Sequence, residues 1–152
     1  IWYDCLNGFN TLTKAADQAA PQSTITMNND NTLFFTVNAN TTYVFTAWIP
    51  VDDSNATADL SYTFTAPSGT VNIQTAYTST ATANVLCNIT TSGTACANST
   101  INSASHYINV TGMAQIAGSG GTLQFQFTQR VSTAASFPVI KKGATLTWHQ
   151  SN

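Results

Sequence analysis

The chain has 152 residues, of which 43% are hydrophobic and 11% aromatic but only 7% charged. This length fits one domain, and a composition so rich in aromatic residues excludes an intrinsically disordered chain. The net charge is -2 with only four basic residues, which argues against binding to nucleic acid. No apolar run approaches the ~20 residues of a membrane span.

Polar but uncharged residues take the place of the missing charges, since a typical domain has about 25% charged residues. Threonine is abundant among them, and its β-branched side chain favours strands. A surface with few charges gives weak repulsion between copies of a protein. The composition therefore favours a β protein that assembles closely over a dilute soluble monomer.

The first 22 residues differ from the rest and are predicted to form an N-terminal arm. Apolar residues recur there at roughly helical spacing, which would fit a short helical turn, and Pro21 ends the segment. The apolar residues of this predicted arm are Trp2, Tyr3, Leu6, Phe9 and Leu12. The arm would either pack on its own domain or dock onto a neighbouring subunit, because exposed apolar patches often mark interfaces.

Residues 23–152 are predicted to form a β domain, because apolar and polar residues alternate with a period of two and clusters of Asn, Asp, Gly and Pro separate the runs. One such cluster, residues 28–31, is predicted to be a turn, and another covers residues 52–55. The predicted strands are Thr24–Met27, Leu33–Val37, Thr41–Ile49, Leu60–Ala66, Val71–Tyr77, Asn84–Thr90, His106–Gly112, Leu123–Arg130 and Ala144–His149.

The alternation also predicts which side chains share a face. In the third predicted strand, Tyr43, Phe45, Ala47 and Ile49 would point one way and Val44, Thr46 and Trp48 the other. Eight or nine short strands separated by turns, with no long amphipathic helix, are typical of a β-sandwich or barrel.

Several short motifs carry a family resemblance. Near the C-terminus stand G-G-T-L-Q-F-Q-F-T-Q (residues 120–129) and K-K-G-A-T-L-T-W (141–148). Upstream and in order come D-N-T-L (30–33), N-T-T-Y (40–43), A-D-L (58–60) and F-T-A-P-S-G (64–69). Together this pattern resembles the β-jelly-roll structural proteins of tailed bacteriophages. Residues 1–22 have no counterpart in it.

The resemblance implies an all-β antiparallel jelly-roll sandwich of about eight strands, commonly a homotrimer, located on the virion. The expected function is that of a decoration (cement) subunit that stabilises a tailed-phage head and contacts the major capsid protein. The alternative is a tail- or fibre-associated module that binds a carbohydrate or a receptor. Neither function requires a cofactor, a metal, a membrane or catalysis, and we expect none.

Three cysteines bear on stability. Cys87 and Cys96 flank a short segment in which Gly93 can supply a turn with positive φ. They are candidates for a disulfide, which would stabilise the fold by about 2–3 kcal/mol in the chain-entropy model. The alternative is two buried thiols that act as small apolar side chains. Cys5 would then be the odd thiol, and the absence of a C-x-x-C motif argues against a zinc site.

Other residue types give weaker functional signals. His106 and His149 lack the spacing of a metal or catalytic motif and are expected to be surface or strand-edge histidines. Asp52, Asp53 and Asp59 offer hard oxygen ligands, but without the EF-hand pattern they favour a plain polar loop over a calcium site.

Aromatic residues on the predicted strands could line a sugar-binding surface, although strand aromatics belong more often to a core or a subunit interface. The residues considered for sugar binding are Trp2, Trp48, Trp148, Tyr43, Tyr62, Tyr77 and Tyr107.

Overall fold

A computed structural model of the chain describes residues 8–53, 59–78, 85–98, 106–134 and 137–151. The described residues form twelve strands, and none of them belongs to a helix long and apolar enough to cross a membrane. The strands are β1 (Asn10–Thr13), β2 (Gln18–Ala19), β3 (Asn28–Val37), β4 (Thr42–Asp53), β5 (Leu60–Thr65), β6 (Thr70–Thr78), β7 (Val85–Ile89), β8 (Cys96–Asn98), β9 (His106–Gln115), β10 (Gly121–Gln129), β11 (Pro138–Ile140) and β12 (Thr145–Ser151).

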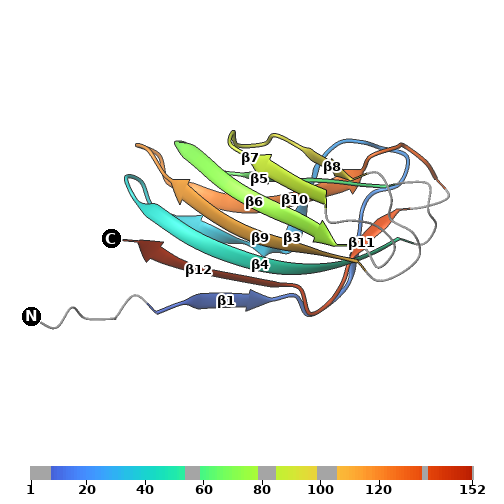
Figure 1. The fold of residues 1–152 in the computed structure, drawn as a ribbon, viewed down its shortest axis with the longest axis horizontal. Helices are drawn as coiled ribbons and strands as arrows, with labels where there is room; N and C mark the ends of the chain where they lie inside the picture. Colours follow the sequence, from blue (N-terminus) through green and yellow to red (C-terminus); the bar gives the residue numbers. More distant parts are fainter. Residues whose placement is uncertain (1–7, 54–58, 79–84, 99–105, 135–136, 152) are drawn as a thin grey trace, which may run out of the picture.

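The strands form two antiparallel sheets that pack face to face (Figure 1). The larger sheet has the order β1-β12-β4-β9-β6-β7, with β11 beside the end of β4 and β2 beside β11. The smaller sheet has the order β3-β10-β5-β8. This arrangement confirms the predicted all-β jelly-roll sandwich, in which two four-stranded sheets, β4-β9-β6-β7 and β3-β10-β5-β8, form the roll.

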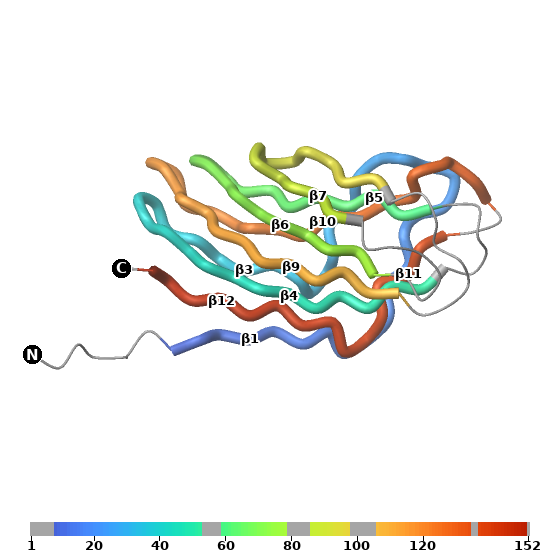
Figure 2. The backbone as a smooth tube through the Cα atoms, in the orientation of Figure 1, coloured from blue at the N-terminus to red at the C-terminus, as the bar shows by residue number. Residues whose placement is uncertain are grey.

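The pairing of the strands shows how the chain builds this fold. Strand β6 pairs with β7, β5 with β8, β4 with β9, β3 with β10, β2 with β11 and β1 with β12. The chain is therefore one long antiparallel hairpin that is rolled up, with its tip between β6 and β7 and its open end at β1 and β12. The backbone trace in Figure 2 shows the two strands of the open end side by side.

Alternating apolar residues from both sheets fill the core, as the period of two predicts. Phe45 of β4 contacts Phe64 of β5, and Phe64 contacts Phe125 of β10, with ring centroids 5.5 and 5.1 Å apart. Trp148 of β12 stacks on Phe35 of β3 with a centroid distance of 4.6 Å. Burial of a large apolar side chain stabilises a fold by about 1.5–3 kcal/mol, so this aromatic cluster contributes much of the stability.

Gly112 of β9 has a specific role in this packing. It lies opposite Phe45 in the β4–β9 pair, and a Cβ atom at this position would stand 2.3 Å from Phe45 Cζ. The absence of a side chain at Gly112 therefore leaves the space in which the ring of Phe45 lies.

The beginning of β3 differs from the prediction. Residues 24–27 form no strand, and residues 28–31, predicted as a turn, open β3 instead. The register between β3 and β10 shifts between Gln124 and Gln126, and the carboxylate of Asp30 accepts hydrogen bonds from the backbone N–H groups of Thr32 and Leu33. A buried aspartate thus satisfies the backbone of the irregular stretch, which makes a strand from residues whose types favour a turn.

The described part of the predicted arm, residues 8–22, contains β1 and β2 and no helical turn. Leu12 pairs with Leu146 of β12, and Ala19 pairs with Val139 of β11. These residues extend the larger sheet of their own chain, because the C-terminal strands provide free backbone groups for them to pair with.

Candidate functional site

The side of the larger sheet that faces away from the core, here called the outer face, carries a row of polar residues. The row follows the register of six neighbouring strands, from β1 to β7. Its members are Thr11, Thr147, Thr46, Thr111, Gln74 and Asn88. All are exposed or half-buried, and the hydroxyl groups of the first two are hydrogen-bonded at 2.9 Å.

Large apolar side chains interrupt this polar surface. Trp48 of β4 is 45% exposed, Met113 of β9 is 37% exposed and Leu86 of β7 is 77% exposed. The indole of Trp48 lies beside the ring of Tyr107, with centroids 6.3 Å apart, and also lines a shallow depression with Asn109 and neighbouring threonines. The outer face therefore offers apolar area together with hydroxyl and amide groups.

The charged side chains that the structure describes lie at one end of the sandwich, around β11 in Figure 1. They are Lys14, Asp17, Asp30, Asp52, Asp59, Arg130, Lys141 and Lys142. Over the rows from Trp48 to Val44, the outward positions of β4, β9, β6 and β12 are uncharged apart from the titratable His149. Charge and the central outer face are thus spatially separated.

A surface ion pair ties the segment before β2 to the turn before β12. The carboxylate of Asp17 accepts hydrogen bonds from the ammonium group of Lys141 and from the backbone N–H of Lys142. The bond from Lys141, followed by that from Lys142, lowers the pKa of Asp17 below its usual value, while the bond to Asp17 raises the pKa of Lys141. Both charged forms are therefore favoured in the folded state.

Lys14, just after β1, is the most unusual charged residue. Its side chain is fully buried, and its Nζ donates hydrogen bonds to Asp30 Oδ2 at 2.9 Å, Asn31 Oδ1 at 2.6 Å and Gln18 Oε1 at 2.9 Å. A buried ammonium requires such partners, because removing a charge from water costs several kcal/mol. The sequence did not single out Lys14, and its only signal was a lone lysine in an otherwise uncharged stretch.

The Lys14 cluster, defined as Lys14, Gln18, Asp30 and Asn31, joins the two sheets. Lys14 follows β1 of the larger sheet, whereas Asp30 and Asn31 belong to β3 of the smaller one. The backbone of Lys14 is also fixed, since its N–H bonds to the carbonyl of Ala144 and its carbonyl accepts from Gly143. The amine is therefore held in place from both its backbone and its tip.

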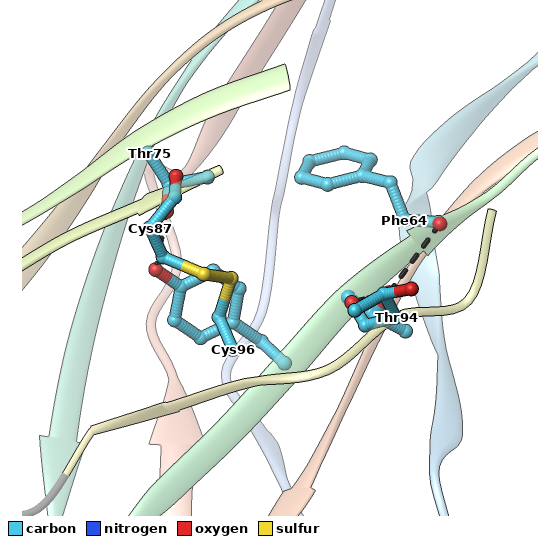
Figure 3. The surroundings of a disulfide bond; sticks show 7 residues. Phe64, Thr75, Cys87, Thr94 and Cys96 are labelled. Atoms are coloured by element: carbon cyan, nitrogen blue, oxygen red, sulfur yellow. Dashed lines mark hydrogen bonds between the residues drawn. A yellow bond between two sulfur atoms is a disulfide. The ribbon is translucent and has the colours of Figure 1, made fainter. Parts of the chain in front are cut away.

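A disulfide joins Cys87 to Cys96 (Figure 3). The prediction considered paired strands or one loop, but Cys87 lies in β7 of the larger sheet and Cys96 in β8 of the smaller one. The bond therefore closes the sandwich between two sheet edges. Beside it, the hydroxyl of Thr75 is 2.7 Å from that of Tyr62, which packs below the bridge in the core.

The docking residues of the predicted arm are only partly described, since Trp2, Tyr3 and Leu6 lie outside the described residues. Phe9 is 72% exposed and contacts His149 of β12 edge to face, with ring centroids 4.6 Å apart. Leu12 is half-buried on β1. The part of the arm that the structure describes thus lies along its own sheet and leaves one large aromatic side chain exposed to solvent.

The histidines and acidic residues do not come together. The prediction of a surface position is wrong for His106, which is 1% exposed in β9 and lies beside the ring of Tyr77 at 5.5 Å, because its strand position points into the sandwich. Asp52 lies in β4, and Asp59 pairs with Arg130 at 3.3 Å. No group of three potential metal-ligating His, Cys, Asp or Glu side chains occurs among the described residues.

The aromatic residues considered for sugar binding separate into two groups. Tyr43, Tyr62 and Tyr77 are buried in the core, and Trp148 is partly buried against it. Trp48 and the half-buried Tyr107 lie on the outer face. Trp2 is outside the described residues.

No family model and no curated protein matches the chain. Among solved structures, the chain aligns with those of infectious bursal disease virus, with a TM-score of 0.25 and 10% identity for the Gx strain and 0.26 and 11% for the Gt strain. The alignments cover 94% and 96% of this chain. The chain spans only 40% and 38% of the length of those chains.

Proposed function

We propose that the protein is a structural subunit of a tailed-phage virion that decorates the head as a homotrimer and contacts the major capsid protein. Two findings support this function: the ordered motifs that resemble phage structural proteins, and the jelly-roll topology that the strand pairing establishes. The proposal assigns a mechanical function to the protein and includes no turnover of a substrate.

The observation that carries the proposal is the uncharged outer face with its exposed apolar residues. Two surfaces can associate at low cost where no charge must leave water, and Trp and Met are characteristic of interface cores. Trp48 and Met113 provide apolar area, while Thr46 and Thr111 provide hydroxyl groups that can pair across an interface. A second copy of this chain, which has the same neutral surface, is the partner that we propose for this face.

A decoration subunit stabilises a shell by mass action, because it binds the assembled lattice and not its separated parts. The fold is suited to this function, since the disulfide and the Lys14 cluster each fix the two sheets to one another. A rigid subunit loses little conformational freedom when it binds, so more of its contact energy remains as affinity.

The proposal is tested by sedimentation of the full chain and two variants. Trp48→Lys places a charge on the outer face, whereas Phe34→Lys places one at a similarly exposed aromatic position, 40% exposed, on the smaller sheet. We expect trimers for the wild type and Phe34→Lys and monomers for Trp48→Lys, with unchanged urea midpoints. A trimer that survives Trp48→Lys would contradict the proposed interface, and a monomeric wild type would contradict the trimer.

A second candidate function is binding of a carbohydrate on the same face. The half-exposed ring of Trp48, with Tyr107 beside it and Asn109 in the same depression, provides an apolar platform and hydrogen-bonding groups. Glycan-array binding that disappears in Trp48→Ala and persists in Phe34→Ala would favour this function. Absence of binding by the wild type would leave only the first.

A further inference from the structure

The Lys14 cluster places a primary amine against a side-chain amide. Lys14 Nζ lies 2.6 Å from Asn31 Oδ1, the shortest of its contacts, and both oxygens of Asp30 lie within 3.1 Å of the same nitrogen. The side chains of Lys14 and Asp30 are 0% exposed. A nucleophile, an amide carbonyl and a carboxylate therefore meet at one point that lies largely away from solvent.

We propose that Lys14 and Asn31 join in an intramolecular isopeptide bond, with Asp30 as the catalytic acid and base. Asp30 takes one proton from the Lys14 ammonium, and the freed lone pair of Nζ attacks Cγ of Asn31. A C–N bond to Lys14 forms, the bond from Cγ to the Asn31 amide nitrogen breaks, and Asp30 relays protons to the departing nitrogen. The products are a secondary amide and ammonium, so no oxidant or other reactant is needed.

The surroundings of Asp30 suit proton transfer. Burial disfavours a separated ammonium and carboxylate, so a neutral amine and a neutral acid become accessible in a site that water does not reach. The backbone N–H groups of Thr32 and Leu33 both donate to Asp30 Oδ1 at 2.8 Å and hold this oxygen in place. Oδ2, which receives neither of these bonds, lies 2.9 Å from Lys14 Nζ and is suited to accept the proton.

The carbonyl of Asn31 is also prepared for attack. Its Oδ1 accepts a hydrogen bond from the hydroxyl of Thr32 at 3.0 Å as well as the bond from Lys14. Negative charge develops on this oxygen when the amine adds, and a fixed donor stabilises that charge. Holding the amine and the amide together makes the reaction effectively unimolecular, which favours it strongly over the same reaction between separate molecules.

Gln18 is the less suitable amide in the cluster. Its Oε1 accepts bonds from Lys14 Nζ and from the backbone N–H of Asn31, and its Nε2 donates to the carbonyl of Asn29 at 2.9 Å. The nitrogen that would have to leave is therefore retained by a hydrogen bond. For the nitrogen of Asn31, the structure gives no such bond among the described residues.

The bond would link the end of β1 to β3 and thereby join the two sheets covalently. This connection lies at the open end of the rolled hairpin, whereas the Cys87–Cys96 disulfide lies near its tip. With both bonds in place, neither end of the hairpin could unroll by loss of hydrogen bonds alone.

The test is the intact mass of the folded, full-length chain after prolonged incubation, measured once the disulfide has been reduced and the chain denatured. We expect a mass lower than that of the sequence by one ammonia, and a proteolytic fragment in which peptides containing Lys14 and Asn31 are joined. Lys14→Arg keeps the positive charge but removes the nucleophilic amine, so it should lose both signals. Lys141→Arg, the matched exposed control, should keep both.

The other outcomes are equally clear. A loss of ammonia that persists in Lys14→Arg would mean cyclisation of an asparagine on its own backbone and would overturn the proposal. A loss of water with a link to Asp30 would overturn the assignment to Asn31. An unchanged mass in a chain whose urea midpoint shows that it is folded would contradict the reaction altogether. Asp30→Asn should leave the peptides unlinked if Asp30 acts as the base.

Discussion

The two ends of the rolled hairpin are closed in different ways. Near the tip, Cys87 and Cys96 join the sheets by one covalent bond between residues only nine positions apart. Near the open end, Lys14 joins them through a buried amine that depends on several polar partners. The disulfide acts chiefly by restricting the unfolded chain. The Lys14 cluster acts in the folded state, and its benefit depends on every partner being present.

This difference predicts that removal of Lys14 has the largest effect. Lys14→Met leaves the carboxylate of Asp30 buried without its cation, and breaking a buried pair in this way costs about 3–5 kcal/mol. Urea unfolding should show this loss. The matched control, Lys141→Met, removes a lysine from an exposed pair and should change the stability by about 1 kcal/mol or less. Equal losses in the two variants would contradict the role of burial.

Removal of the disulfide should have the next largest effect. In Cys87→Ala/Cys96→Ala the unfolded chain regains the freedom of a short loop, which lowers the stability by about 2–3 kcal/mol in the chain-entropy model. The wild type unfolded in the presence of a reductant should show a similar loss. If only the double variant were destabilised, packing of the alanines and not the bond would explain the effect.

The two closures should act independently, because they lie at different parts of the sandwich and share no partner. The loss in stability for Lys14→Met combined with Cys87→Ala/Cys96→Ala should equal the sum of the separate losses within about 0.5 kcal/mol. Denaturant unfolding of the four proteins forms the required cycle. A larger coupling energy would mean that the two ends of the hairpin communicate through the core.

The smallest effect should come from the exposed pair of Asp17 and Lys141. The pKa of Asp17 is lowered, so its contribution is present above the unfolded value near 3.8 and fades as the pH falls through the folded value. The pKa of Lys141 is raised, so its contribution is lost as the pH rises beyond about 10.5. The small difference in urea midpoint between wild type and Asp17→Asn should therefore vanish in acid. A difference that persists unchanged at low pH would contradict this pairing.

Much of the jelly roll could be predicted from local patterns. The alternation of Phe45 and Ala47 with Thr46 and Trp48 places the same residues inside and outside as the structure does. Such a period of two depends only on neighbouring residues, so a single sequence reveals it. The short strands β1, β2, β8 and β11 were missed, because two to four residues are too few to show a period.

The Lys14 cluster could not be predicted for a different reason. Lys14 meets Asp30 across 16 positions of sequence, and the meeting depends on the irregular register of β3 against β10. Asp30 and Asn31 are residue types that favour turns, and only the buried amine explains why they lie within a strand. A contact that local preference opposes becomes visible only once the tertiary structure is known.

The outer face shows the same limit for function. The sequence placed Trp48 opposite the core residues of its strand, but not beside Met113 and the threonines of other strands, because that grouping depends on the order β12-β4-β9-β6. The separation of charged residues from this face likewise results from the rolled hairpin.

Assembly is the central claim of the proposed function, and the mass of the wild-type chain in solution tests it most directly. Light scattering over a range of concentrations should give three times the chain mass of 16.1 kDa at the higher concentrations, with dissociation on dilution. A mass that stays at that of one chain throughout would contradict a self-assembling virion subunit.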